Sequence, residues 1–164
     1  MSNKIYPIGI QNFEKLRLGG YFYIDKTALI YKMVKTGSYY FLSRPRRFGK
    51  SLLISTLEAY FQGKKELFEG LAMEKLETEW RRHPILHMDL NIGKYDTPDS
   101  LDRILNKALT DWEAIYGTGA AETTLALRFA GIRKRAYEQT GERVVILVDE
   151  YDKPMLQAIN NEAL

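Results

Sequence analysis

Three short apolar runs without helical period stand out along the chain. They are Tyr39–Leu42, Ile85–Leu90 and Val144–Val148, and each has the length of a buried strand. The last run is continuous and mostly β-branched, which is typical of a parallel strand covered on both faces. The pattern therefore predicts three strands, spread over most of the chain.

Between these runs, apolar residues recur at helical spacing. The clearest case is the stretch 97–116, in which apolar residues from Leu101 to Trp112 fall on one helical face. Asp25 is a candidate cap for an earlier helix. Residues 1–20 are punctuated by proline and glycine, and we expect an irregular lead-in there. Helices are predicted over residues 26–35, 50–61, 97–116, 121–139 and 155–164.

The order of these elements predicts the fold class. Strand and helix patterns alternate along residues 21–164, as in an α/β protein with a doubly wound, mainly parallel sheet. The carboxyl ends of parallel strands lie on one side of such a sheet, and ligands gather there. Side chains that follow different strands are therefore expected to converge.

Composition and charge narrow the classes of function. The chain has 164 residues, which fits one domain, and the absence of cysteine excludes disulfides and thiolate metal sites. Its 24 Lys and Arg against 21 Asp and Glu give a net charge of +3, which is small for a dedicated nucleic-acid module. No secretory signal and no membrane-spanning segment are predicted, so we expect a cytoplasmic location and no membrane partner.

A candidate phosphate-binding loop precedes the helix predicted over 50–61. The string from Arg44 to Ser51 reads RPRRFGKS, and its second half matches the end of the pattern G-x-x-x-x-G-K-[ST]. Gly49 lets the backbone approach phosphates, Lys50 supplies a cation for the β- and γ-phosphates, and the Ser51 hydroxyl can ligate Mg²⁺. Arg44 replaces the first glycine, so a basic surface loop with a chance Gly-Lys-Ser stays an alternative. The residues expected to bind the nucleotide are Arg46, Arg47, Phe48, Gly49, Lys50, Ser51 and Leu52.

Two adjacent carboxylates follow the third strand. Asp149 and Glu150 come directly after Val144–Val148, as in the second half of an ATP site. Asp149 would hold the Mg²⁺ shell and Glu150 would orient and deprotonate the attacking water, because successive residues at a strand end point in different directions. In the alternative interpretation, Asp149 caps the following helix, and Asp152 and Lys153 are solvated neighbours.

Three strings of the chain together resemble a known family. Tyr23–Thr27 reads YIDKT, Phe41–Leu53 reads FLSRPRRFGKSLL and Val148–Pro154 reads VDEYDKP. With these strings nearly the whole chain is similar to the AAA-ATPase-like family, whose own pattern includes the arginine at position 44. The resemblance implies a P-loop ATPase with a three-layer α/β/α fold that uses ATP and Mg²⁺. In many members it also implies a C-terminal nuclease-like domain of the PD-(D/E)XK type.

The resemblance further implies a strand with a polar sensor residue after the acidic strand. Residues 21–164 are therefore expected to be the N-terminal portion of a P-loop ATPase domain that ends before this sensor strand. We accordingly expect a gap, or an exposed hydrophobic edge, between the strands at 39–43 and 144–148. A nucleic acid or a partner protein is expected to bind through the absent C-terminal region, and the oligomeric state stays open.

The resulting hypothesis is Mg²⁺-dependent ATP binding and hydrolysis. Glu150 and Lys50 take the catalytic roles, and Ser51 and Asp149 are the metal ligands. Turnover would drive a conformational or nucleic-acid-linked process. Two alternatives stay open: a nucleotide-binding switch or scaffold with negligible hydrolysis, and a nucleic-acid module that uses the loop arginines.

Other chemistry-bearing residues have several interpretations. The arginines at 46–47 assist the γ-phosphate, contact a partner or stay solvated. Asp25 is first a helix cap, and second a contact near the adenine or between domains. The run Arg133–Arg135 is first a solvated helix face, and second a nucleic-acid patch. His83 and His87 lack a metal-site pattern and receive no role.

Overall fold

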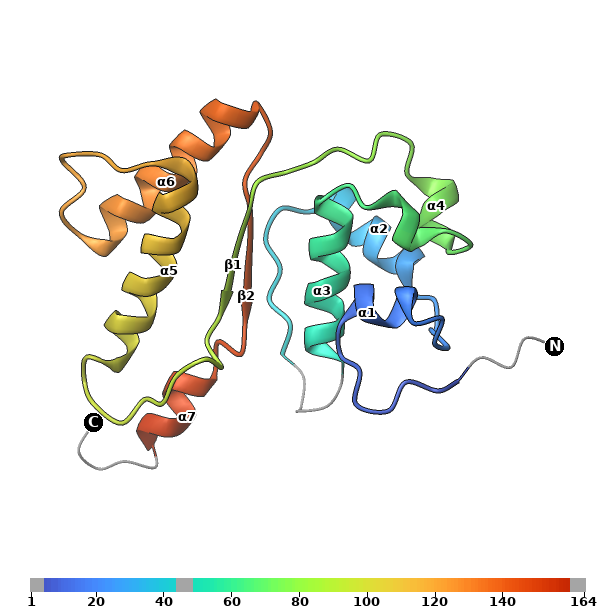
Figure 1. Ribbon diagram of the computed structural model, residues 1–164, viewed down its shortest axis with the longest axis horizontal. Coiled ribbons are helices and arrows are strands. Elements are labelled where there is room, and N and C mark those ends of the chain that lie inside the picture. The colour runs from blue at the N-terminus through green and yellow to red at the C-terminus, as the bar shows by residue number, and fades with distance from the viewer. Residues whose placement is uncertain (1–4, 44–48, 160–164) are drawn as a thin grey trace. The chain divides into compact units, whose positions relative to one another are not determined.

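The computed structural model describes residues 5–43 and 49–159. The chain divides into two compact units, Met1–Arg82 and His83–Leu164, and each is described by itself. The first unit is helical, and the second contains a parallel sheet with its own helices (Figure 1). Among the described residues, no helix is long and apolar enough to span a bilayer.

The first unit consists of short helices around an aromatic and aliphatic core. Helix α1 packs against α3 and helix α2 against α4. Phe13, Phe68 and Met73 are fully buried at the centre, and the rings of the two phenylalanines lie 4.9 Å apart. The elements are α1 (Phe13–Leu18), α2 (Thr27–Thr36), α3 (Lys50–Phe61), the 3₁₀ helix η1 (Lys65–Phe68) and α4 (Ala72–Leu76).

Asp25 connects the start of α2 to the start of α4. Its Oδ1 accepts hydrogen bonds from the Thr27 amide (2.8 Å) and the Thr27 hydroxyl (2.7 Å), and its Oδ2 accepts one from the Ala72 amide (2.7 Å). The buried Thr27 hydroxyl oxygen in turn accepts from the Met73 amide at 3.0 Å. Partial burial disfavours the charge of Asp25, but the hydrogen bonds outweigh it and lower its pKa. Asp25 therefore bonds the first amide of α2 from the position before the N-cap residue Lys26, and it also joins two helices.

A buried carboxylate, Glu77, ties three parts of the first unit together. It is 5% exposed and accepts hydrogen bonds from the Tyr60 hydroxyl of α3 (2.5 Å) and from the Thr78 and Glu79 amides (2.9 and 3.0 Å). It also pairs with the Lys35 ammonium of α2 at 2.9 Å. Burial disfavours its charge, but these donors prevail and lower the pKa of Glu77 to about 2.

The second unit is a parallel strand pair joined through two helices. Strands β1 (Ile85–Asp89) and β2 (Val145–Asp149) are in register from one end to the other. Their connection contains α5 (Ser100–Tyr116) and α6 (Leu125–Thr140), which pack against each other, and α7 (Lys153–Ile159) follows β2 (Figure 1). The core of this unit comprises Leu86, Leu109, Trp112 and Ile132.

Ion pairs fix α6 against α5 and against the loop between them. Arg128 donates from Nε and Nη2 to the two carboxylate oxygens of Glu113, both at 2.7 Å. Arg135 pairs with Glu122 and also donates to two backbone carbonyls at the end of α5. One cation of the run 133–135 is therefore used inside the fold, and the other two are exposed. The predicted solvated helix face is therefore correct for Arg133 and Lys134 but not for Arg135.

The structure differs from the predicted elements in several places. Part of the expected irregular lead-in is helix α1, because Asn12 Oδ1 caps it by accepting from the Lys15 amide at 2.9 Å. Helices η1 and α4 were not predicted either. The predicted strand Tyr39–Leu42 is wrong: its side chains are 37–96% exposed, and an apolar run becomes a strand only beside a hydrogen-bonding neighbour.

The α/β class and the parallel pairing are confirmed by the second unit. The described residues form a two-stranded sheet, however, rather than the larger three-layer arrangement that was expected. On β2, Ile146 and Val148 are 43% and 40% exposed. Ile146 and Val148 are two residues apart, so apolar surface is open on one face of β2. Separately, the apolar side chains of residues 39–42 are exposed, and the predicted gap between these two segments stays a prediction.

Candidate functional site

The described part of the candidate phosphate loop is the start of α3. Gly49 is the N-cap of this helix and has φ 76°, a left-handed conformation that favours glycine. A Cβ at this position would meet no atom within 4 Å, so backbone conformation rather than space selects glycine. Lys50 and Ser51 form the first turn and are half-buried. The predicted phosphate residues Arg46, Arg47 and Phe48 lie outside the described residues.

Helix α3 is anchored by its C-terminal half. Thr56, Leu57, Ala59 and Tyr60 are buried, whereas residues 50–55 are only half-buried. The N-cap residue is glycine, so it has no side chain that could bond the first-turn amides. These amides, the positive end of the helix dipole and the Lys50 ammonium together favour an anion.

Hydrogen bonds of the Ser55 and Thr56 hydroxyls help to anchor this helix. The Ser55 hydroxyl donates to the Leu52 carbonyl at 3.0 Å and accepts from the Phe13 amide at 3.0 Å, so it joins α3 to the start of α1. The Thr56 hydroxyl donates to the same Leu52 carbonyl at 2.7 Å. Leu52, predicted to bind nucleotide through its backbone, therefore also receives the hydroxyls that anchor the helix.

The candidate acidic residues lie at the carboxyl end of β2. Asp149 is the last residue of the strand, and its Oδ1 accepts from the Glu150 amide at 2.9 Å. Glu150 has φ 53°, a left-handed conformation that is strained for a residue with a side chain. Strain of this kind persists only where surrounding contacts fix it, and it is enriched at functional sites.

One part of the alternative interpretation of this segment is wrong. Helix α7 begins at Lys153, whose amide donates to the Glu150 carbonyl at 3.0 Å. Lys153 is not simply solvated. Its ammonium donates to the backbone carbonyl of Asn91 at 2.8 Å and to Asn91 Oδ1 at 2.6 Å.

A further carboxylate, Asp89, lies beside Asp149 and was missed by the sequence reasoning. The register of the two strands places Asp89 directly opposite Asp149, so two parallel strands end in aspartate at the same edge of the sheet. Asp89 Oδ1 accepts from the Asn91 amide at 2.8 Å. The signal in the sequence was a lone charged residue inside the apolar run Ile85–Leu90.

The donor atoms of the predicted metal ligands suit magnesium. Ser51 and Asp149 offer a hydroxyl and a carboxylate, which are hard oxygen ligands, and they do not suit a soft thiophilic metal. Within the described part of the chain, no group of three or more His, Asp or Glu residues could hold a metal ion. Mg²⁺ commonly takes only one or two protein ligands beside water and substrate phosphates, so these residues fit it.

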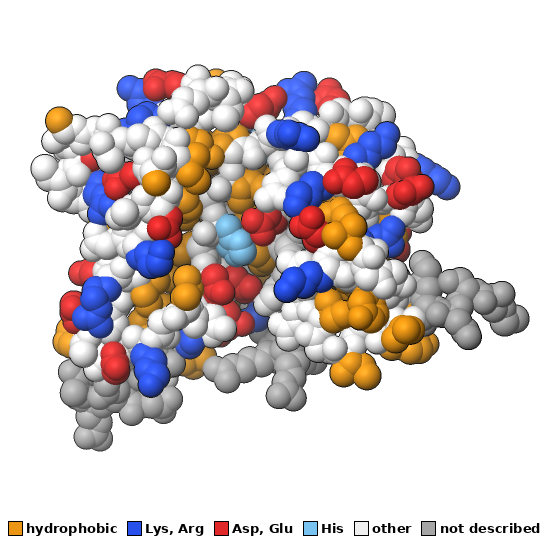
Figure 2. Space-filling view, viewed as in Figure 1, with side chains coloured by type: hydrophobic (Ala, Val, Ile, Leu, Met, Phe, Trp, Pro, Cys, Tyr) orange, Lys and Arg blue, Asp and Glu red, His pale blue; other side chains and the backbone are white. Residues whose placement is uncertain are grey.

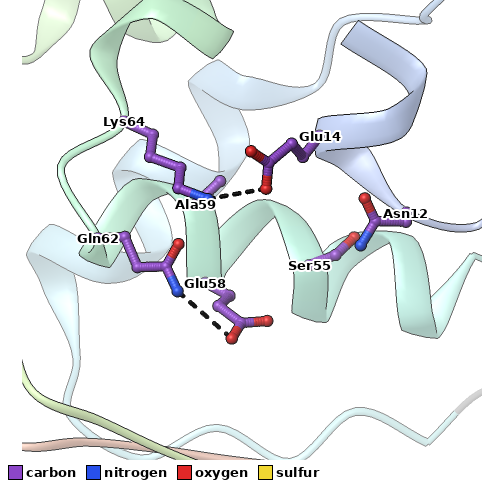
Figure 3. Close-up of a pocket in the computed structure, with 7 residues that line it drawn as sticks. All are labelled: Asn12, Glu14, Ser55, Glu58, Ala59, Gln62 and Lys64. Carbon is purple, nitrogen blue, oxygen red and sulfur yellow. Dashed lines mark hydrogen bonds and ion pairs between the residues drawn. The ribbon is translucent and has the colours of Figure 1, made fainter. Parts of the chain in front are cut away.

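A small polar hollow in the first unit is not the phosphate site. It has a volume of about 120 Å³ and lies along the C-terminal half of α3, where Lys64 pairs with Glu14 at 2.8 Å (Figure 3). A second carboxylate, Glu58, also lines it, so an anionic ligand would be repelled. The hollow is too small for a nucleotide.

Charge is mixed over the face of the molecule that Figure 2 shows. Basic and acidic side chains alternate there, and no broad area carries cations alone. Nucleic-acid modules usually present a basic stripe or patch. The visible face therefore gives no support to a dedicated nucleic-acid surface.

Comparison with known proteins gives two matches. A family model described as "Predicted AAA-ATPase" matches residues 7–164. The chain is 43% identical over 157 residues to a protein of Azotobacter chroococcum mcd 1 described as "Uncharacterized protein in vnfD 5'region". That match covers 95% of this chain but only 30% of the relative, so the chain spans less than a third of the relative's length. No solved structure gives a significant match.

Proposed function

The chain belongs to the family of predicted AAA-ATPases, and from this premise we propose that it binds ATP with Mg²⁺ and hydrolyses it. Lys50 contacts the β- and γ-phosphates, and Ser51 and Asp149 hold Mg²⁺. Glu150 orients the attacking water and takes its proton. The remaining loop residues, Arg46, Arg47, Phe48, Gly49 and Leu52, complete the phosphate contacts.

One observation carries the proposal most directly: α3 begins behind a left-handed glycine, and Lys50 is the first residue of the helix. Four first-turn amides of any helix lack intrahelical partners, and the N-cap here is a glycine, which has no side chain to bond them. A triphosphate would satisfy them while Lys50 neutralises part of its charge.

The turn that contains Asp149 and Glu150, called the acidic turn below, supplies the second half of the proposed chemistry. Bound Mg²⁺ would neutralise charge on the phosphates, and Asp149 is the carboxylate at the strand end that fits it. The backbone of Glu150 turns sharply away from the strand, so its side chain leaves in another direction from that of Asp149. Such a division allows one carboxylate to serve the metal and the other the water.

The proposal includes a three-layer P-loop fold to which residues 21–164 contribute. Exposed apolar side chains on residues 39–42 and on β2 are surface that a larger sheet would bury. A cytoplasmic location, the process that turnover drives and any nucleic-acid or protein partner stay predictions from the sequence.

The proposal is tested by steady-state turnover of Mg-ATP. Glu150→Gln should lower kcat at least about tenfold while ATP still binds, because the amide keeps the shape but cannot take a proton. Glu138→Gln is the matched control, since that carboxylate lies on the exposed face of α6 with 55% of its side chain accessible.

Three outcomes separate the candidate functions. Glu150-dependent turnover supports the proposal. ATP binding without turnover in the unmodified chain would instead indicate a nucleotide switch. Turnover that is equal in Glu150→Gln and in the control would refute the role of Glu150.

A further inference from the structure

We propose that Lys153 is a positioning residue that acts through Asn91 to hold the acidic turn in its working geometry. This inference rests on the proposed function, since the turn comprises Asp149 and Glu150. It adds a residue outside the predicted phosphate, metal and water contacts.

The contact joins two loops that are far apart in sequence. Lys153 Nζ donates to the Asn91 carbonyl at 2.8 Å and to Asn91 Oδ1 at 2.6 Å. Asn91 lies two residues beyond the end of β1, and Lys153 lies four residues beyond the end of β2. The Lys153 side chain thus bonds both the backbone and the side chain of Asn91 in the loop after β1.

Lys153 occupies a position that local electrostatics disfavour. It is the first residue of α7, where the helix dipole presents its positive end and favours an acidic side chain. Hydrogen bonds to the two oxygens of Asn91 offset this unfavourable interaction with the dipole. A conflict between local preference and observed structure is expected at functional sites.

The contact closes a ring of hydrogen bonds around the acidic residues. The Lys153 amide donates to the Glu150 carbonyl at 3.0 Å, and the Glu150 amide donates to Asp149 Oδ1 at 2.9 Å. On the other loop, the Asn91 amide donates to Asp89 Oδ1 at 2.8 Å. The Leu90 amide donates to the Asp149 carbonyl at 3.1 Å, and this bond joins the two sides.

The strained backbone of Glu150 needs these hydrogen bonds to hold it in place. A residue with φ 53° would relax to an ordinary conformation if the turn were free to move. The Lys153 ammonium is a side-chain link across the turn, and it fixes the residue three positions after Glu150. Without it, the Glu150 carboxylate would sample several directions, and few of them would suit the attacking water.

Turnover of Mg-ATP by the full chain tests the positioning role. Lys153→Met keeps an unbranched side chain up to the position of Cε and removes the ammonium, so kcat should fall about tenfold with KM changed less than about twofold. Lys153→Arg keeps two donors and should restore most of kcat. Asn91→Ala removes Oδ1 but keeps the backbone carbonyl, so its loss of kcat should be smaller than that of Lys153→Met. In the double variant, Asn91→Ala should lower kcat little beyond the loss caused by Lys153→Met.

Lys107→Met is the matched control, because Lys107 forms an exposed i,i+4 pair with Asp111 on α5. A kcat for Lys153→Met equal to that of the control would overturn the positioning role and leave the proposed function standing. An equal loss in Lys153→Arg and Lys153→Met would also overturn it, because donor geometry would then be irrelevant.

Amide hydrogen exchange gives a readout that needs no turnover. Residues 150–153 should exchange faster in Lys153→Met than in Lys107→Met, with unchanged protection in β1 and β2. If the unmodified chain has no turnover, the proposed function fails. Hydrogen exchange alone then tests whether the Lys153–Asn91 contact holds the turn in place. Equal exchange in the two variants would then refute it.

Discussion

Replacement of Glu77 by glutamine should destabilise the first unit by about 2–3 kcal/mol at neutral pH. The fall in its pKa from 4.5 to about 2 corresponds to roughly 3 kcal/mol, at 1.36 kcal/mol per pKa unit. The Lys35 side chain is 44% exposed, so water screens its share and this figure is an upper bound. A glutamine would keep an acceptor for the backbone amides but would turn its own donor toward Lys35 or Tyr60.

The loss should depend on pH in a defined direction. The pKa of Glu77 is lowered in the folded chain, so its contribution is complete above the unfolded value of 4.5 and is lost as the pH falls toward 2. Urea unfolding of the original chain and Glu77→Gln, followed by circular dichroism, should therefore show a smaller difference at about pH 3.5 than at neutral pH.

The neighbouring carboxylate provides the control for this experiment. Glu79 is 56% exposed and pairs with Arg81 at the surface, so Glu79→Gln should change stability by less than about 0.5 kcal/mol. The reasoning would be refuted by an equal loss at both pH values. A loss at neutral pH no larger than that of the control would refute it as well.

Three further substitutions test other parts of the structure. Asp25→Ala removes the cap of α2 and the link to the Ala72 amide, and should lower the free energy of unfolding by about 1–2 kcal/mol; an unchanged urea midpoint would contradict this. Gly49→Ala forces a side chain into the left-handed region at a cost of about 1–2 kcal/mol, so ATP affinity should fall, and unaltered affinity in a titration would count against the loop assignment. Arg128→Met leaves Glu113, only 12% exposed, without its partner and should cost about 1–3 kcal/mol in urea without changing ATP turnover. Loss of turnover at full stability would mean that this pair has another role.

Local signals in the sequence predicted most helices and both described strands. Apolar spacing from Leu101 to Trp112 places α5, and the β-branched run Val144–Val148 places β2 within one residue. Asp25 before Thr27 was a sufficient cap signal for α2. These features depend on neighbours in sequence, so periodicity and capping chemistry are enough to find them.

The missed features depend on neighbours in space. Tyr39–Leu42 has strand-like residues, but pairing decides whether a strand forms. Asp89 matters because the register sets it opposite Asp149, and register is not visible in one sequence. Lys153 received a place only in the alternative interpretation, as a solvated neighbour, since nothing in the string VDEYDKP shows that Asn91 lies within reach.

Helix α1 was missed for a different reason. Asn12 is the cap of this helix, but the prediction rested on the glycines and the proline of residues 1–20 and did not use the asparagine. The helix has only six residues, and its stability comes from burial of Phe13 and Leu16 rather than from local propensity. Short helices of this kind are fixed by packing, which the pattern of the segment alone does not contain.

The central claim is that Lys50 and the start of α3 bind the phosphates of ATP. Its most direct test is equilibrium binding of ATP in the presence of Mg²⁺ to the chain and to Lys50→Ala, with Lys134→Ala on the exposed face of α6 as the control. The account predicts an affinity at least about tenfold lower for Lys50→Ala and unchanged for the control. Equal affinity of the original chain and Lys50→Ala would contradict it.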